Sequence, residues 1–182
     1  MDATSSGIAV PLQSSSFLQY LVPLTQAVRP RQWIKNLACF AGLIFSGRLF
    51  HPSAIIQALL ACAGFCLAAS AVYLFNDVLD RQLDRLNPAK RHRPVASGRL
   101  PVSWAIGASA LLSLAAVGTT FWLNPICTAL MAVYLVTNVA YSFRLKHTVL
   151  LDVLIIAFGF VLRVLHGVYA IEVKPTAWIV LC

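Results

Sequence analysis

The chain has 182 residues, of which 59% are hydrophobic and only 11% are charged. Soluble globular domains carry about 25% charged residues, so this composition excludes an ordinary soluble domain, a disordered chain and a coiled coil. The net charge of +8 comes from 14 Lys and Arg residues against 6 Asp and Glu residues. In a soluble protein this balance would indicate nucleic acid. In a membrane protein it follows from the placement of basic residues on one side, so we expect no nucleic-acid partner.

The N-terminal segment is polar and has no basic stretch followed by an apolar core, so we do not interpret it as a signal peptide. We expect residues 1–24 to form a flexible lead and residues 25–182 to form one transmembrane domain. The five cysteines lie in apolar stretches without CxxC spacing. We therefore interpret them as packing residues and expect neither a thiolate metal site nor a disulfide framework.

Charge-free windows predict the membrane-spanning helices, each of which needs about 20 mostly apolar residues. The window between Arg99 and Arg144 is long enough for two spans, and Asn124-Pro125, a typical turn dipeptide, divides it. The chain is expected to end inside a sixth helix that begins at residue 176. The sequence thus predicts an all-α, polytopic transmembrane bundle with five spans. The five predicted helices cover residues 31–49, 53–80, 102–123, 126–143 and 149–171.

The distribution of basic residues predicts the orientation of the bundle. If the N-terminus is cytoplasmic, eleven Lys and Arg residues fall on that side, whereas Arg48 and Lys174 fall on the other. Such an asymmetry is typical of multi-pass membrane proteins. We therefore expect the N-terminus and the acidic loop described next to lie on the cytoplasmic side.

Three of the six acidic residues, Asp77, Asp80 and Asp84, fall within eight positions at the end of the second predicted helix. If that helix continues, the three carboxylates share one face, and Asn76 lies close to it. Converging carboxylates repel each other unless a cation lies among them. Mg²⁺ is the natural candidate, because one or two carboxylates together with substrate phosphates usually hold it.

A dense basic stretch with Lys90, Arg91 and Arg93 follows the acidic cluster. Acids that hold Mg²⁺ next to bases that hold phosphate suit a diphosphate substrate. An alternative interpretation is a solvated helix end whose acids pair with Arg81 and Arg85. For the basic loop taken by itself, the alternative is that it reflects membrane topology alone.

Polar residues inside the predicted spans are further candidates, since an ionisable residue within a span is a functional hypothesis. Asp152 and Arg163 are eleven residues apart in the fifth helix, about three turns, so they share a face. Lys35 and Asn36 lie one turn into the first helix, where a snorkelling lysine is the alternative. For Arg163, the alternative to a functional role is a structural one, in which it pairs with a backbone carbonyl or a carboxylate. We interpret the nearby histidine at position 166 as a packed polar residue.

The segment 76–84 resembles the first Asp-rich motif of the UbiA superfamily of membrane prenyltransferases. The amino-acid sequences of three segments resemble one branch of the superfamily, the decaprenyl-phosphate phosphoribosyltransferases. These segments are RPRQWIKN at 29–36, NDVLDRQLDRLNPAKRHRPVASG at 76–98 and YSFRLKHTVLLDVLIIAFGFVLRVLHG at 141–167. The resemblance extends from about residue 25 to the end of the sequence.

The resemblance implies a helical bundle around a central cavity, located in a bacterial inner membrane, with Mg²⁺ binding a diphosphate. It implies that Asp77, Asp80 and Asp84 hold Mg²⁺ and the diphosphate and act as the catalytic residues. It also implies a second polar motif that this sequence does not reach, so we expect either a missing C-terminal half or self-association. The residues expected to bind substrate are Lys35, Asn36, Asn76, Lys90, Arg91, Arg93, Lys146, Asp152 and Arg163.

Three functions remain open from the sequence. The first is transfer of 5-phosphoribosyl from phosphoribosyl diphosphate to a polyprenyl phosphate, favoured by the many basic residues. The second is an aromatic prenyltransferase of the same fold that uses a polyprenyl diphosphate. The third is an inactive membrane fragment or a transporter-like subunit, although the acids cluster at one end and no inverted repeat is visible. The first two require a polyprenyl lipid, a diphosphate substrate and the lipid bilayer as partners.

Overall fold

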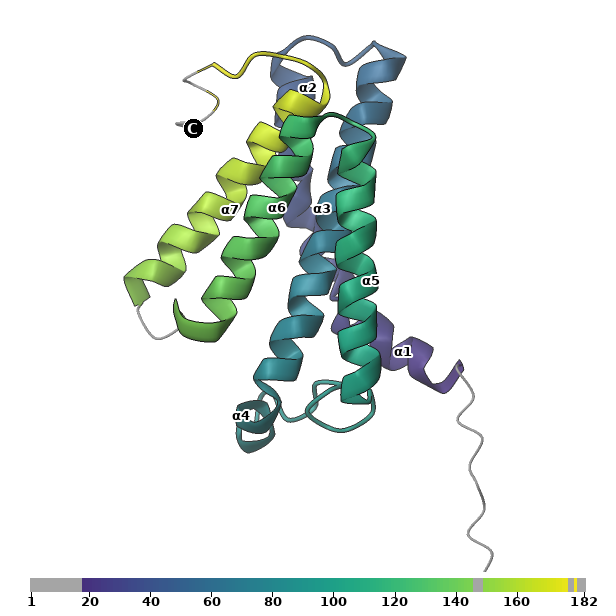
Figure 1. The fold of residues 1–182 in the computed structure, drawn as a ribbon, viewed down its shortest axis with the longest axis vertical. Coiled ribbons are helices and arrows are strands. Elements are labelled where there is room, and N and C mark those ends of the chain that lie inside the picture. Colours follow the sequence, from purple (N-terminus) through teal and green to yellow (C-terminus); the bar gives the residue numbers. More distant parts are fainter. Residues whose placement is uncertain (1–17, 146–148, 177–178, 180–182) are drawn as a thin grey trace, which may run out of the picture.

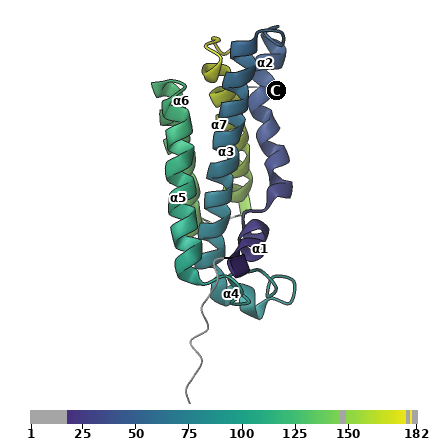
Figure 2. The same cartoon turned by 90° about the vertical axis from the view of Figure 1, so that its right-hand side faces the viewer.

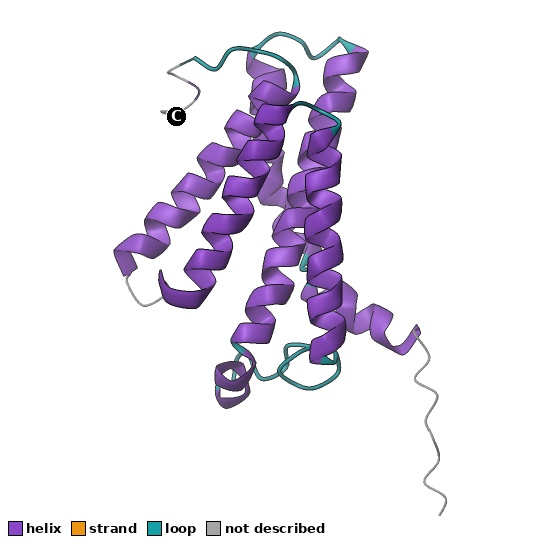
Figure 3. Ribbon diagram, viewed as in Figure 1, coloured by secondary structure: helices purple, strands orange, loops and turns teal. Residues whose placement is uncertain are grey.

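The structure is a computed structural model that describes residues 18–145, 149–176 and 179, and the regular elements in this part are all helical (Figure 3). Four helices are long and apolar enough to cross a membrane. They confirm the second to fifth predicted helices, with bounds that differ by a few residues. These helices are α3 (Pro52–Leu79), α5 (Val102–Phe121), α6 (Pro125–Ala140, extended by the π-helix η2, Tyr141–Leu145) and α7 (Val149–Ala170).

The helices form three layers, which are visible in Figure 2. α5 and α6 lie on one side, α3 and α7 lie in the middle, and the segment before α3 covers the opposite side. α3 and α5 pack closely because small residues face each other. Ser109 donates a hydrogen bond to the carbonyl of Ala71 at 2.8 Å, and Gly64 faces Thr119 and Thr120.

The first predicted helix differs most from its prediction. Instead of one span over 31–49, the structure has a 3₁₀-helix η1 (Pro30–Phe40) followed by the short helix α2 (Ala41–Phe45). 3₁₀ runs longer than about 3–4 residues are uncommon. This one is pressed against α7, where a side chain on Gly167 would overlap the backbone of Cys39. Close packing against α7 accompanies the tighter winding, and neither piece is among the four candidate spans.

A further helix, α1 (Leu18–Ala27), overlaps residues 18–24 of the predicted flexible lead. Its apolar side packs on the bundle, with the Tyr20 ring 5.3 Å from that of Trp104. Ala27 is buried together with Leu74 and Leu100. Residues 18–24 are therefore helical and packed against α3 and α5, although they were predicted to be part of a flexible lead.

The acidic segment is also organised differently from the prediction. α3 ends at Leu79, Asp80 has φ −86° and ψ 0°, and the short helix α4 (Arg81–Leu86) follows. The chain therefore turns at Asp80 and does not continue as one helix through Asp84. Figure 1 shows α4 at the end of the bundle where α3 and α5 lie apart from α6 and α7. The predicted sixth helix from residue 176 lies almost wholly outside the described residues.

Candidate active site

Two adjoining cavities lie along α3 and the α6–η2 segment. Arg29 and the loop after α4 complete one of them, and η1 and α7 complete the other. The first, here called the mouth pocket, has a volume of about 350 Å³. The second, here called the inner pocket, has a volume of about 260 Å³. Tyr73, Asn76 and Tyr141 line both cavities and form the wall between them. The charged residues of the mouth pocket are Arg29, Asp77, Asp80, Lys90 and Arg93, and those of the inner pocket are Lys35, Asp152 and Arg163.

Two of the three clustered aspartates are held by arginines. Arg29 donates to Oδ1 of Asp77 at 2.5 Å, and Arg93 lies 3.4 Å from the same oxygen. Arg93 also donates to Oδ2 of Asp84 at 2.7 Å. Both aspartates are buried, and Oδ2 of Asp77 has no hydrogen-bond partner among the described residues. The alternative pairing with Arg81 and Arg85 is therefore not found for Asp77 and Asp84.

Asp84 differs from the other two aspartates in its position relative to the mouth pocket. Asp77 and Asp80 line the mouth pocket with Asn76, whereas Asp84 does not line it and is bound by Arg93. The chain turns at Asp80, yet Asp77 and Asp84 still converge on one Nη1 atom of Arg93. Within the part of the chain that the structure describes, no group of three or more Asp, Glu, His or Cys side chains is arranged to hold a metal ion.

The predicted phosphate-binding residues have different positions. Lys90 and Arg93 line the mouth pocket, and Lys35 lines the inner pocket. Arg91 is exposed, lines neither pocket, and its Nε lies 3.5 Å from Nε2 of His92. Lys146 lies outside the described residues.

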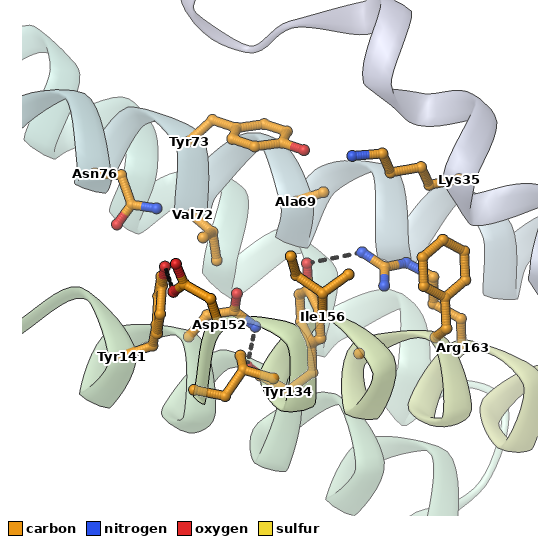
Figure 4. A pocket seen from close by; sticks show the side chains of 14 residues that line it. Lys35, Ala69, Val72, Tyr73, Asn76, Tyr134, Tyr141, Asp152, Ile156 and Arg163 are labelled. Atoms are coloured by element: carbon orange, nitrogen blue, oxygen red, sulfur yellow. Dashed lines mark hydrogen bonds between the residues drawn. The ribbon is translucent and has the colours of Figure 1, made fainter. Parts of the chain in front are cut away.

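Arg163 is a buried cation at the inner pocket, with 8% of its surface exposed. Its Nε donates to Oδ1 of Asn36 at 2.8 Å, and its Nη2 donates to the Tyr134 hydroxyl at 3.1 Å. The guanidinium carbon lies 5.1 Å from the centre of the Tyr134 ring and 5.5 Å from those of Phe65 and Phe160. Figure 4 shows this group opposite Lys35. None of the ion pairs in the described segments involves Arg163.

Asp152 and Arg163 both line the inner pocket, which confirms that they share a face of α7. Asp152 accepts a hydrogen bond from the Tyr141 hydroxyl. Asn36 was also predicted to bind substrate. It is buried, lines neither pocket, and donates to Sγ of Cys66 at 3.2 Å while accepting from Arg163. Its position is that of a residue that orients Arg163.

Several pocket residues were not among the predicted site residues. Arg29 was counted only as a cytoplasmic base, yet its left-handed backbone (φ 53°) accompanies a side chain that lies over the Tyr73 ring and reaches Asp77. Ser142 donates to Asn76, which fixes a wall of the mouth pocket. One signal was available, because polar residues recur at helical spacing in an otherwise apolar window. These residues are Tyr134, Asn138, Tyr141 and Ser142.

His166 is fully buried, and its ring lies edge-on to Phe65 with the centroids 5.0 Å apart. Neither ring nitrogen has a hydrogen-bond partner among the described residues. The residue lines neither pocket, in agreement with its interpretation as a packed polar residue.

Residues 36–182 match the UbiA prenyltransferase family. The chain is 39% identical over 162 residues to the decaprenyl-phosphate phosphoribosyltransferase of Mycolicibacterium smegmatis, covering 87% of this chain and 51% of the relative. It is 34% identical to the enzyme of the same name from Mycobacterium tuberculosis, covering 87% of this chain and 54% of the relative. The chain thus spans about half the length of these relatives.

Solved structures have the same fold. A UbiA homologue from Archaeoglobus fulgidus bound to DMAPP and Mg²⁺ superposes with a TM-score of 0.74 at 19% identity, covering 85% of this chain and 56% of that one. A digeranylgeranylglyceryl phosphate synthase gives a TM-score of 0.78 at 19% identity, covering 89% and 56%. The apolar helices and these matches define an integral membrane protein. The chain belongs to the UbiA prenyltransferase family.

Proposed function

We propose that this chain carries the diphosphate site of a Mg²⁺-dependent membrane transferase that moves 5-phosphoribosyl from phosphoribosyl diphosphate to a polyprenyl phosphate. The observation that carries the proposal is the presence of three charged side chains in the inner pocket. This pocket adjoins the acidic and basic mouth pocket, and it contains Lys35, Asp152 and Arg163. An isoprenoid chain behind the diphosphate would favour an apolar cavity, because burying charges beside a hydrocarbon is costly. A sugar phosphate suits a cavity that contains these charged side chains.

Asp77 and Asp80 are the proposed carboxylate ligands of Mg²⁺, with Asn76 beside them. The buried Oδ2 of Asp77 has no hydrogen-bond partner among the described residues, as expected for an oxygen that binds a cation. Two carboxylates suffice for Mg²⁺ when substrate phosphates and water complete the shell. Bound Mg²⁺ would neutralise charge on the departing diphosphate. In this proposal Asp84 acts through Arg93, to which it is bound.

The reaction requires little covalent help from the protein. The bond between C1 of the ribose and the diphosphate oxygen breaks, and the electron pair leaves with the diphosphate. A new bond forms between C1 and an oxygen of the lipid phosphate, which is already an anionic nucleophile, so no proton must be removed. Arg29, Lys90 and Arg93 would orient the diphosphate and stabilise the charge that develops on it.

The proposed site lies on the cytoplasmic side of a bacterial inner membrane. Three basic residues of the mouth pocket, Arg29, Lys90 and Arg93, belong to the side that carries the excess of Lys and Arg. That side also receives water-soluble phosphoribosyl diphosphate, whereas the lipid acceptor would enter from the bilayer.

An aromatic prenyltransferase activity is the second candidate. Apolar residues form part of the inner pocket and could receive the start of an isoprenoid chain. These residues are Val72, Ile155, Ile156 and Phe160. The solved homologue from Archaeoglobus fulgidus is bound to a prenyl diphosphate, DMAPP, and Mg²⁺. The two functions differ in their donor, so a donor assay separates them.

The test uses membranes that contain this chain, labelled phosphoribosyl diphosphate and polyprenyl phosphate, with and without Mg²⁺. We expect Mg²⁺-dependent transfer of label into the lipid fraction, and its loss in Asp80→Asn. Glu172→Gln, which removes a carboxylate that lines neither pocket, is the matched control and should keep the activity. Transfer from polyprenyl diphosphate to an aromatic acid instead would establish the second candidate. Absence of both activities would contradict both proposals for this chain on its own.

A further inference from the structure

We infer that the inner pocket is a subsite for a phosphate monoester carried on a sugar, with Arg163 and Lys35 as the residues that bind the phosphate. This inference rests on the proposed function, because it assigns the inner pocket to the ribose 5-phosphate end of the donor. The mouth pocket then holds only the diphosphate end. Two cavities with separate sets of charged residues motivate the division.

The first argument is the uncompensated charge of Arg163. An arginine stays protonated, and a buried charge is costly unless it is paired. The hydrogen-bond partners of Arg163 within residues 18–145 and 149–176 are the neutral groups of Asn36 and Tyr134. No carboxylate in these segments forms an ion pair with it. The missing countercharge fits an anionic ligand in the pocket that Arg163 lines.

The second argument is that the guanidinium is fixed in place before a ligand arrives. Asn36 and Tyr134 hold Nε and Nη2, and the aromatic rings surround the group. Nη1 lies close to Gly159, where a Cβ atom would come within 3.1 Å of it. The absence of a side chain at Gly159 thus leaves room for the guanidinium beside the cavity. A preorganised arginine binds a phosphate at a low entropic cost.

The third argument is the second cation. Lys35 comes from η1 and lines the same pocket, and Figure 4 shows its ammonium group facing the Arg163 guanidinium at the end of the cavity away from Tyr141. A phosphate monoester carries up to two negative charges near neutral pH, since its second pKa is about 6. Two cations therefore match one such group.

The fourth argument is the lining between the two ends of the donor. Asp152 lies seven residues before Gly159 on α7, about 10 Å along the helix axis. Asp152 accepts a hydrogen bond from Tyr141, which belongs to the wall shared with the mouth pocket. A carboxylate accepts several hydrogen bonds, so Asp152 can also receive those of ribose hydroxyl groups. Sugar hydroxyls beside Asp152 would place the 5-phosphate toward Arg163 and C1 toward the diphosphate.

The experiment measures binding to the full chain in lipid nanodiscs. The probes are ribose 5-phosphate, inorganic diphosphate with Mg²⁺, and a short-chain polyprenyl phosphate. We expect ribose 5-phosphate to bind, and Arg163→Met to weaken this binding by about 10- to 100-fold, as expected for lost hydrogen bonds to a charged group. Diphosphate binding should stay unchanged in Arg163→Met and fall in Asp77→Asn.

Arg48→Met is the matched control, because Arg48 lines neither pocket and donates to the carbonyl of Ile171 at 2.8 Å. It should bind all probes like the original chain. Arg163→Met could unfold, in which case it would bind no probe and show no thermal unfolding transition. The inference is then tested with Lys35→Met, because Lys35 is exposed and its replacement should not disturb the packing. Lys35→Met should weaken ribose 5-phosphate binding several-fold, and unchanged binding would overturn the inference.

Other outcomes separate the inference from the proposed function. Failure of ribose 5-phosphate to bind, in a chain that transfers phosphoribosyl to lipid, would overturn the inference and leave the function standing. Loss of polyprenyl phosphate binding alone in Arg163→Met would also overturn it and assign the cations to the acceptor. Arg163-dependent binding of ribose 5-phosphate without transfer would support the subsite and contradict the proposed reaction.

Discussion

Arg93 donates to Oδ2 of Asp84 at 2.7 Å and reaches Oδ1 of Asp77 at 3.4 Å with the same Nη1 atom. One guanidinium therefore connects an aspartate that lines the mouth pocket with one that does not. Asp84 does not line the pocket, yet it binds an arginine that does. Under the proposed function, Asp77 and Asp80 would be ligands of Mg²⁺, and Asp84 would hold Arg93 in position.

We expect Asp77→Asn to raise the Mg²⁺ concentration needed for half-maximal transfer by about tenfold or more, because the buried carboxylate contributes the charge that attracts the cation. The measurement is a Mg²⁺ titration of transferase activity in membranes. Glu172→Gln should leave the titration curve unchanged. An unchanged curve in Asp77→Asn would exclude this carboxylate as a metal ligand.

Asp84→Asn should behave differently. This variant keeps the proposed Mg²⁺ ligands Asp77 and Asp80 but weakens the hydrogen bond that holds Arg93. We therefore expect the KM for the diphosphate donor to rise about tenfold, as for a lost hydrogen bond to a charged group. The Mg²⁺ titration should move little. If Asp84→Asn shifts the Mg²⁺ requirement as strongly as Asp77→Asn, Asp84 is a direct ligand and the division of roles is wrong.

Tyr134→Phe removes the hydroxyl that accepts from Nη2 of Arg163 and keeps the ring. The lost hydrogen bond to a charged group should raise the donor KM by about 10-fold. Steady-state kinetics with varied donor would show the change, and kcat should fall less than kcat/KM. Tyr169→Phe, which removes a hydroxyl that lines neither pocket, should have no kinetic effect.

Gly167→Ala tests the close packing of η1 on α7. A Cβ at this position would overlap the backbone of Cys39, so the helices must move apart. Overpacking of this kind costs about 1–3 kcal/mol, and we expect a lower thermal unfolding midpoint in detergent. Gly118→Ala on α5 is the matched control, because a Cβ there has no neighbour within 4 Å. Equal midpoints for the two variants would contradict the packing argument.

The sequence indicated much of the helical framework. Long apolar windows and the Asn124-Pro125 turn predicted the helices now seen as α3, α5, α6 and α7, because a spanning helix depends on local hydropathy. The sequence also predicted that Asp77, Asp80 and the basic residues that follow them lie in one region. Helical periodicity correctly placed Asp152 and Arg163 on one face of α7.

Local patterns were insufficient where a residue takes its conformation from distant contacts. The 3₁₀ winding of η1 accompanies its packing on Gly167 of α7, and the position of α1 involves Trp104 of α5. The end of α3 at Leu79 was likewise not predicted, and Asp84 binds Arg93 without lining the mouth pocket.

The partners of the charged groups were decided by the tertiary structure alone. Arg29 pairs with Asp77 across 48 positions, and Asn36 accepts from Arg163 across 127. Hydropathy and periodicity report on neighbours within a few turns, so they identify which residues are polar and which face they share. Which cation neutralises which carboxylate depends on how helices from distant parts of the chain meet. For that reason the sequence determined the bundle and its polar end, whereas packing decided that Arg163 is buried without a described carboxylate partner.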